Sequence, residues 1–164
     1  MDIVFSDYFP YDHHEPELPP LVDGADGKRR RVVIAGGGPT GLALALALAV
    51  QGIPSVVLEA DATVCTGSRA SAFTRRTMEI LDRLGVIDSV LDTSLRWKEG
   101  WTFHGMTEIA RMRLPDDDEQ KFPPSISQLQ NYIEHCLARK AKEDYSDLIE
   151  IRWQSRLCGL EADG

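Results

Sequence analysis

The chain has 164 residues, of which 43% are hydrophobic and 27% are charged, and its formal net charge is −8 at pH 7. A chain of this length and composition can bury a hydrophobic core without disulfides, which argues against disorder of the whole chain. The acidic balance argues against a nucleic-acid-binding domain, because such domains need an excess of Lys and Arg to displace counterions from phosphates.

The first 29 residues are expected to form an irregular extension, because they hold four of the nine prolines and show no sustained periodicity. The Asp-His-His-Glu run at residues 12–15 is more typical of a solvated proline-rich segment than of a metal site. The basic run at residues 28–31 is interpreted as a charged entrance to a strand rather than as a nuclear signal.

No membrane span or secretory signal is expected. The N-terminus lacks a basic start followed by a long apolar stretch, and the most apolar segment, residues 42–50, is far shorter than the roughly 20 residues that cross a bilayer. The three cysteines are odd in number and widely spaced, which is typical of free thiols in a reducing compartment. We therefore expect a cytoplasmic protein.

Regular structure is predicted from Arg31 onward. Residues 32–35 form a short apolar, β-branched run that is typical of a buried parallel strand. Residues 42–50 alternate Leu and Ala, so both faces are apolar and a buried helix is expected, closed by Gly52. Residues 55–59 repeat the buried-strand pattern. Together these segments predict a right-handed βαβ unit.

The spacing Gly36-x-Gly38-x-x-Gly41 lies between the first strand and the helix, where it predicts a phosphate-binding turn. Gly36 allows the tight turn, Gly38 lets the backbone approach a pyrophosphate, and Gly41 lets the helix pack closely on the strand. The helix begins near Pro39, which suits a first-turn position, and its N–H groups and dipole then face the phosphates.

Glu59 ends the second strand 18 residues beyond Gly41, where a carboxylate can accept hydrogen bonds from the hydroxyls of an adenosine ribose. The same carboxylate would repel a 2′-phosphate, which argues against NADP at this site. FAD and NAD share the adenosine diphosphate half, so the spacing alone does not distinguish them. A chance glycine turn with an exposed Glu is the disfavoured alternative.

The remaining segments predict a looser α/β pattern. Residues 71–84 have helical spacing and stop at Gly85, and residues 127–142 form a second amphipathic helix. Candidate strands, two of which flank a turn at Gly105, are residues 101–103, 109–114, 149–153 and 157–160. The acidic run at residues 116–119 is interpreted as a solvated loop rather than as a cation site.

Two further segments resemble a known family. Gly-Ser-Arg-Ala at residues 67–70, with the helix that follows Arg75, and Gln-Asn-Tyr-Ile-Glu-His-Cys-Leu at residues 130–137 resemble the FAD-dependent aromatic-ring hydroxylases. These flavoprotein monooxygenases are related to phenol hydroxylase, para-hydroxybenzoate hydroxylase and 3-(3-hydroxyphenyl)propionate hydroxylase. The resemblance runs from about Arg31 to the end of the chain. It implies that Arg69 approaches the FAD pyrophosphate or ribityl region and that Gln130 hydrogen-bonds the flavin cofactor.

The expected fold class is therefore α/β, an incomplete Rossmann-like FAD/NAD(P)-binding fold with a small β excursion, in which residues 1–29 are the extension and residues 30–164 the N-terminal part of an FAD-binding domain. His135 is expected to pack or lie on the surface rather than to catalyse, and no catalytic residue and no metal ligand is assigned. The candidate cofactor-binding residues are Gly36, Gly38, Pro39, Thr40, Gly41, Glu59, Ala60, Arg69 and Gln130.

The resemblance implies hydroxylation of a phenolic or aromatic substrate by FAD, with NADH or NADPH as transient reductant and O2 as oxidant. The sequence lacks the family's second FAD motif, a Gly-Asp pair, and its substrate domain, so weak or absent FAD binding and no activity are expected for this chain alone. Two alternatives stay open: another FAD oxidoreductase, of halogenase or isoprenoid reductase type, and a non-catalytic nucleotide-binding remnant. The aromatic substrate and the oligomeric state are not specified by the sequence.

Overall fold

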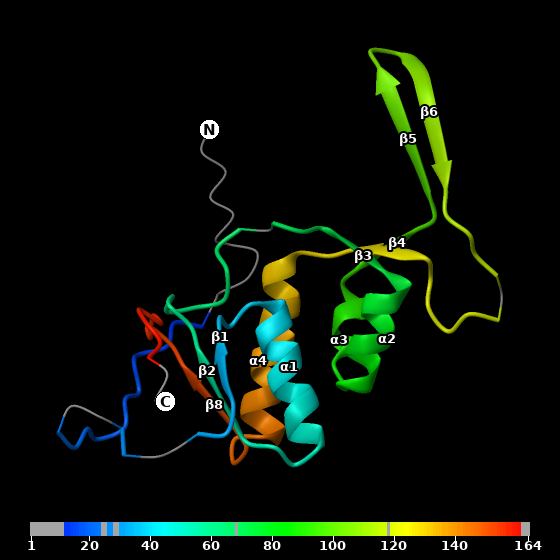
Figure 1. The fold of residues 1–164 in the computed structure, drawn as a ribbon. Helices are drawn as coiled ribbons and strands as arrows, with labels where there is room; N and C mark the ends of the chain where they lie inside the picture. The colour runs from blue at the N-terminus through cyan, green and yellow to red at the C-terminus, as the bar shows by residue number, and fades with distance from the viewer. Residues whose placement is uncertain (1–11, 24–25, 28–29, 68, 118, 162–164) are drawn as a thin grey trace.

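A computed structural model of the chain describes residues 12–23, 26–27, 30–67, 69–117 and 119–161. These ranges contain both helices and strands, in a mixed order (Figure 1). In chain order the elements are β1 (Val33–Ala35), α1 (Pro39–Val50), β2 (Ser55–Leu58), β3 (Ala72–Thr74), α2 (Arg75–Arg83), α3 (Ile87–Asp92), β4 (Leu95–Trp97), β5 (Glu99–His104), β6 (Thr107–Arg113), β7 (Ser125–Ser127), α4 (Gln130–Asp144) and β8 (Ile149–Arg152).

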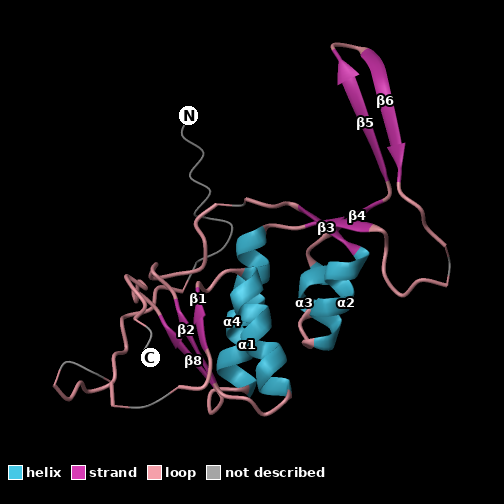
Figure 2. Cartoon of the chain, viewed as in Figure 1, coloured by secondary structure: helices cyan, strands magenta, loops and turns pink. Residues whose placement is uncertain are grey.

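The main sheet is parallel, with the strand order β1-β2-β8, and the βαβ unit predicted from the sequence is confirmed. Its middle strand, β2, is buried from Ser55 to Val57, as expected for a parallel strand with a neighbour at each edge and helices next to the sheet. Helices α1 and α4 lie side by side next to this sheet (Figure 2). The alternating Leu and Ala run forms the predicted helix α1, and Leu42 and Leu46 are fully buried in the core. The expected burial of both faces is wrong, because Leu44 and Val50 lie on a face that is exposed.

A second sheet is antiparallel, with the order β3-β7-β4, and it corrects the helix predicted over residues 71–84. Residues 72–74 form β3 and pair with β7, so the helix α2 begins only at Arg75. Pairing with a strand some fifty residues away supplies backbone hydrogen bonds that the local helical pattern does not reveal. The predicted stop is confirmed, because Gly85 has φ +72° directly after the helix.

Several other segments also differ from the prediction. The helix α3 and the strands β4 and β7 were not predicted, since each is at most six residues long. Helix α4 begins at Gln130 rather than at Ser127, because residues 125–127 belong to β7. The strand expected over residues 157–160 is wrong, as this segment has no regular structure.

The strands β5 and β6 form the hairpin predicted around Gly105, which has φ +59°. The hairpin projects away from the rest of the chain (Figure 1), and every residue of β6 is exposed. Arg111 lies over the ring of Trp101 at 5.1 Å and forms an ion pair with Glu99. The hairpin is thus held by contacts between its own two strands. The acidic run that follows it lies partly outside the described residues, and its Asp116 pairs with Arg75 and Lys98.

The N-terminal segment, residues 12–23, lies beside the turn that follows β8. The ring of His14 stacks on Trp153 with centroids 4.4 Å apart, and the His14 N–H donates to Ala62. Further along, Asp26 and Arg30 form ion pairs with Arg152 and Glu150 of β8. The segment before the sheet is therefore attached at two places. The basic run at residues 28–31 lies partly outside the described residues.

Among the described residues, no helix combines the length and apolar character that crossing a membrane requires.

Candidate functional site

The glycine-rich turn joins β1 to α1 at the carboxyl edge of the parallel sheet. Gly36 has φ +100°, a backbone conformation that favours glycine, and its N–H donates to Leu58 of the neighbouring strand at 2.8 Å. A Cβ atom added to Gly41 would lie 2.0 Å from the Gly36 carbonyl oxygen. Helix and turn approach each other so closely that no larger side chain fits at position 41.

Gly38 stands at the N-cap of α1 with extended backbone, and no side chain caps the helix there. A Cβ atom at Gly38 would meet nothing closer than Glu134 Oε1 at 3.9 Å, so its own packing does not require a glycine. Pro39 occupies the first turn, Thr40 is exposed, and no acidic residue lies in that turn. The helix thus presents uncapped N–H groups and the positive end of its dipole.

Glu59 follows β2 directly and turns its carboxylate back to the glycine-rich turn. Its Oε2 accepts the Gly37 N–H at 2.5 Å, and its Oε1 accepts the Asp61 N–H at 3.0 Å. An added Cβ on Gly37 would lie 3.1 Å from the Glu59 side chain, which explains why position 37 is also a glycine. An ionised carboxylate has about four acceptor positions, so this one can still accept ribose hydroxyls.

A second group of contacts joins Gln130 to the same region. Gln130 begins α4, and its Nε2 donates to Glu134 Oε1 at 2.8 Å. Glu134 Oε2 accepts the Cys65 N–H at 2.7 Å. Burial of the Cys65 thiol, together with the hydrogen bond and charge of Glu134, raises the pKa of Cys65 to about 11. The thiol therefore stays protonated at neutral pH.

Arg69 and Ala60 lie in the segment between β2 and β3. Ala60 is half-buried directly after Glu59, while the side chain of Arg69 is exposed. The positive charge of Arg69 opposes the rise in the pKa of Cys65, so it acts on the same neighbourhood. Of the sequence-predicted residues, those of the turn and Glu59 are in direct contact, whereas Arg69 and Gln130 lie on adjoining segments.

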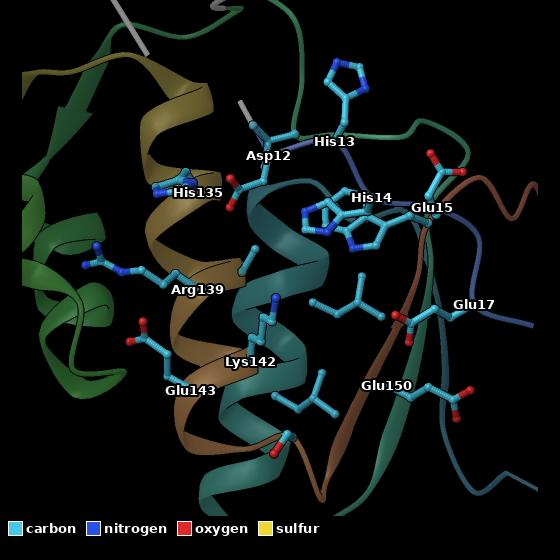
Figure 3. A pocket seen from close by; sticks show the side chains of 16 residues that line it. Asp12, His13, His14, Glu15, Glu17, His135, Arg139, Lys142, Glu143 and Glu150 are labelled. Carbon is cyan, nitrogen blue, oxygen red and sulfur yellow. The ribbon is translucent and has the colours of Figure 1, made fainter. Parts of the chain in front are cut away.

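A cavity of about 850 Å³ lies elsewhere, between the N-terminal segment, α4 and β8 (Figure 3). Its wall mixes acids such as Glu17 and Glu150 with the bases Arg139 and Lys142, and none of the candidate cofactor residues lines it. His135 is half-buried on this wall, with its ring 6.5 Å from that of Tyr132. The cavity and the glycine-rich turn are thus separate features.

Two residues of the site had no predicted role. The motif needs glycine only at Gly36, Gly38 and Gly41, so it assigns no role to Gly37, although three glycines in a row exceed that need. Glu134 is a carboxylate buried beside the apolar face of α4, four residues after Gln130. Both residues belong to the segment at residues 130–137 that resembles the hydroxylases, in which Gln130 alone is given a role. Their spacing puts the two side chains on one face of a helix, and this spacing predicts their contact.

Comparison with known proteins gives a consistent result. Residues 29–164 match the family model described as the FAD binding domain. Para-nitrophenol 4-monooxygenase of Pseudomonas sp. (strain WBC-3) is 33% identical over 135 residues, which are 80% of this chain and 33% of that protein.

Solved structures agree with this match. The p-nitrophenol 4-monooxygenase of Pseudomonas putida superposes with a TM-score of 0.71 at 28% identity, over 82% of this chain and 34% of that one. The flavin-dependent monooxygenase PieE, in complex with FAD and substrate, gives a TM-score of 0.71 at 25% identity, over 85% of this chain and 26% of that one. The chain spans about a third of the length of the Pseudomonas sp. (strain WBC-3) relative, and less of other curated relatives that it matches. It belongs to the FAD binding domain family that FAD-dependent aromatic-ring hydroxylases share.

Proposed function

We propose that this chain binds the adenosine diphosphate half of FAD, as the N-terminal part of the FAD-binding domain of a monooxygenase that hydroxylates a phenolic or aromatic substrate with NADH or NADPH and O2. The observation that carries the proposal is the contact of Glu59 with Gly37, which holds a ribose-binding carboxylate against a glycine-rich helix start. The nitrophenol-oxidising relatives support the aromatic substrate class.

The residues present fit the cofactor. Gly38 leaves open space where a pyrophosphate approaches. Pro39 starts the uncapped first turn, in which Thr40 and Gly41 supply N–H donors and the helix supplies a favourable dipole. Glu59 would accept the ribose hydroxyls, with Ala60 beside it. A 2′-phosphate would meet the Glu59 charge, which favours FAD over NADP at this turn.

Arg69 and Gln130 would complete the site from its two flanking segments. The exposed guanidinium of Arg69 can reach an anionic group, and Gln130 would hydrogen-bond the cofactor with its amide. When bound, FAD supplies the redox chemistry and the activation of O2. The described residues of this chain bind and orient that cofactor.

A reducing, cytoplasmic location is part of the proposal. It is supported by Cys65, Cys136 and Cys158, all of which are free thiols in the structure.

Equilibrium dialysis with FAD tests the assignment of the site. Gly38→Val fills the open space and Glu59→Arg replaces the ribose acceptor, so each variant should weaken binding at least about tenfold, the loss that accompanies a hydrogen bond to a charged group. Glu108→Arg makes the same charge change on the exposed strand β6 and should leave binding unchanged. Wild-type affinity in both site variants would refute the assignment.

A further inference from the structure

Glu134 is a buried carboxylate in the middle of the protein's cofactor region. Its residue is 1% exposed, although it lies on α4 among apolar side chains such as Ile133 and Leu137. Burying a carboxylate is costly unless its oxygens are hydrogen-bonded. Here each oxygen has a donor, since Oε1 accepts Gln130 Nε2 at 2.8 Å and Oε2 accepts the Cys65 N–H at 2.7 Å.

Three separate segments meet at this side chain. Gln130 is the first residue of α4, Cys65 belongs to the loop that follows β2, and the Cβ position of Gly38 in the glycine-rich turn lies 3.9 Å from Glu134 Oε1. These are the same segments that carry the candidate cofactor-binding residues.

We propose that Glu134 is a positioning residue of the cofactor site, which fixes the orientation of the Gln130 amide and holds the Cys65 loop beside the glycine-rich turn. The proposal rests on the proposed FAD-binding function. It assigns Glu134 no direct contact with the cofactor, because a side chain 1% exposed with both oxygens engaged by the protein has no open face.

The orientation follows from the chemistry of the two groups. A carboxylate that accepts at both oxygens can receive only the NH2 end of an amide. The carbonyl oxygen of Gln130 must then point away from Glu134. A glutamine at position 134 can either donate or accept, so both orientations of the Gln130 amide become possible and the preference is lost.

The Cys65 thiol reports on the same side chain without any cofactor. After burial itself, Glu134 is the main reason why the pKa of Cys65 is raised to about 11. Replacing Glu134 by a neutral residue should therefore lower the pKa of Cys65, so that the thiolate forms at lower pH and alkylation of Cys65 is faster. The exposed Cys158 serves as an internal reference in the same sample.

The test compares Glu134→Gln with Glu143→Gln, which removes the same charge from an exposed position of the same helix. In the cofactor-free chain, the rate of iodoacetamide labelling of Cys65 is followed against pH by mass spectrometry. Glu134→Gln should move the Cys65 profile to lower pH, and Glu143→Gln should not. An unchanged profile in Glu134→Gln would overturn the proposal.

The second readout is the FAD dissociation constant from equilibrium dialysis. Glu134→Gln should weaken FAD binding by about tenfold, the loss expected for a hydrogen bond to a charged group. If Glu134 acts through Gln130, adding Glu134→Gln to Gln130→Ala should weaken binding little further, because the two effects are coupled. If the two substitutions weaken FAD binding by fully additive free energies, Glu134 does not act through Gln130.

Glu134→Asp separates positioning from folding, because it keeps the carboxylate on a shorter arm. If Glu134→Gln fails to fold, a folded Glu134→Asp with a high Cys65 pKa and weaker FAD binding supports the proposal, and wild-type FAD affinity in that variant contradicts it. Because this chain alone is expected to bind FAD weakly, the refuting outcome for the proposed function is a wild-type chain that shows no binding even at millimolar FAD. The Cys65 profile would then decide whether Glu134 orders the loop.

Discussion

Gly38 and Gly41 lie three residues apart, yet a methyl group would meet different surroundings at each. At Gly41 it would lie 2.0 Å from the Gly36 carbonyl oxygen, which is backbone and cannot move aside without disturbing the turn. At Gly38 the nearest atom is 3.9 Å away. One glycine is needed for the fold, and the other leaves room for a ligand.

This difference leads to opposite expectations for two alanine variants. Gly41→Ala should lower the free energy of unfolding by about 1–3 kcal/mol through overpacking. Gly38→Ala should keep wild-type stability and weaken FAD binding, since the added methyl group occupies the approach to the turn. Urea denaturation and FAD titration of both variants check this, with Gly159→Ala as a control whose added Cβ meets nothing within 4 Å. Equal destabilisation by the two variants would contradict it.

Residues whose role depends on local geometry were the predictable ones. The positions of Gly36 and Gly41 follow from the strand, turn and helix pattern, and the structure shows why each needs a glycine. Gly37 and Glu134 act through residues 22 and 69 positions away along the chain, at Glu59 and Cys65. Contacts of that range are set by tertiary packing, which one sequence does not display.

Among the elements, those with a strong apolar pattern are predicted from the sequence, and short ones without such a pattern are not. The apolar runs of β2 and α1 predict these two elements, because neither run is interrupted by a charged residue. In the structure only one face of α1 is buried, and Leu44 and Val50 on its other face are exposed. Strands β3 and β7 have three residues each, and they exist because they pair with each other. For β3, pairing outweighed the helical spacing of residues 71–84.

The attachment of the N-terminal segment to β8 should depend on pH through His14. The pKa of this imidazole is lowered, and burial is the largest cause. The folded state therefore favours the neutral ring that stacks on Trp153. The stabilising contribution is therefore complete above about pH 6.5, the ordinary histidine value, and is lost as the pH falls through the lowered pKa. Hydrogen exchange of residues 12–23 at pH 7 and pH 5 should show faster exchange, corrected for intrinsic rates, at the lower pH.

His14→Phe keeps an aromatic ring on Trp153 and removes the titration, so the difference between the two pH values should disappear. His13→Phe alters the exposed neighbour and should retain the difference. A pH response that survives in His14→Phe would assign the effect to another group.

Trp101 and Trp153 should differ in their contribution to the free energy of unfolding. Trp153 is 6% exposed beside the main sheet, and its replacement by alanine should cost about 3–5 kcal/mol. Trp101 is 49% exposed on the projecting hairpin, where the same change should stay within about 0.5 kcal/mol. Urea unfolding of the two variants measures both values. A large loss of stability in Trp101→Ala would contradict this expectation and would mean that the hairpin is coupled to the main sheet.

At the scale of the whole molecule, the chain carries one side of a cofactor site. All its candidate residues belong to the glycine-rich turn, the loop after β2 and the start of α4, and the chain spans about a third of its curated relative. The 164 residues suffice for a hydrophobic core, while the matched relatives contain this unit within a longer chain.

We therefore expect no hydroxylation by the purified chain. With FAD, NADPH or NADH, and p-nitrophenol as a test phenol, oxidation of the nicotinamide should not increase when the phenol is added, because no described residue is assigned to bind the ring. Product formation above a no-protein control would contradict this expectation.

The most direct test of the central claim is a residue-resolved titration of the isotopically labelled chain with FAD, followed by amide nuclear magnetic resonance, which detects weak binding. The largest chemical-shift changes should fall on the amides of residues 36–38, 40–41 and 59, with none on the hairpin of residues 99–113. Changes centred elsewhere, or unshifted amides in the glycine-rich turn at millimolar FAD, would contradict the assignment of this turn as the FAD site.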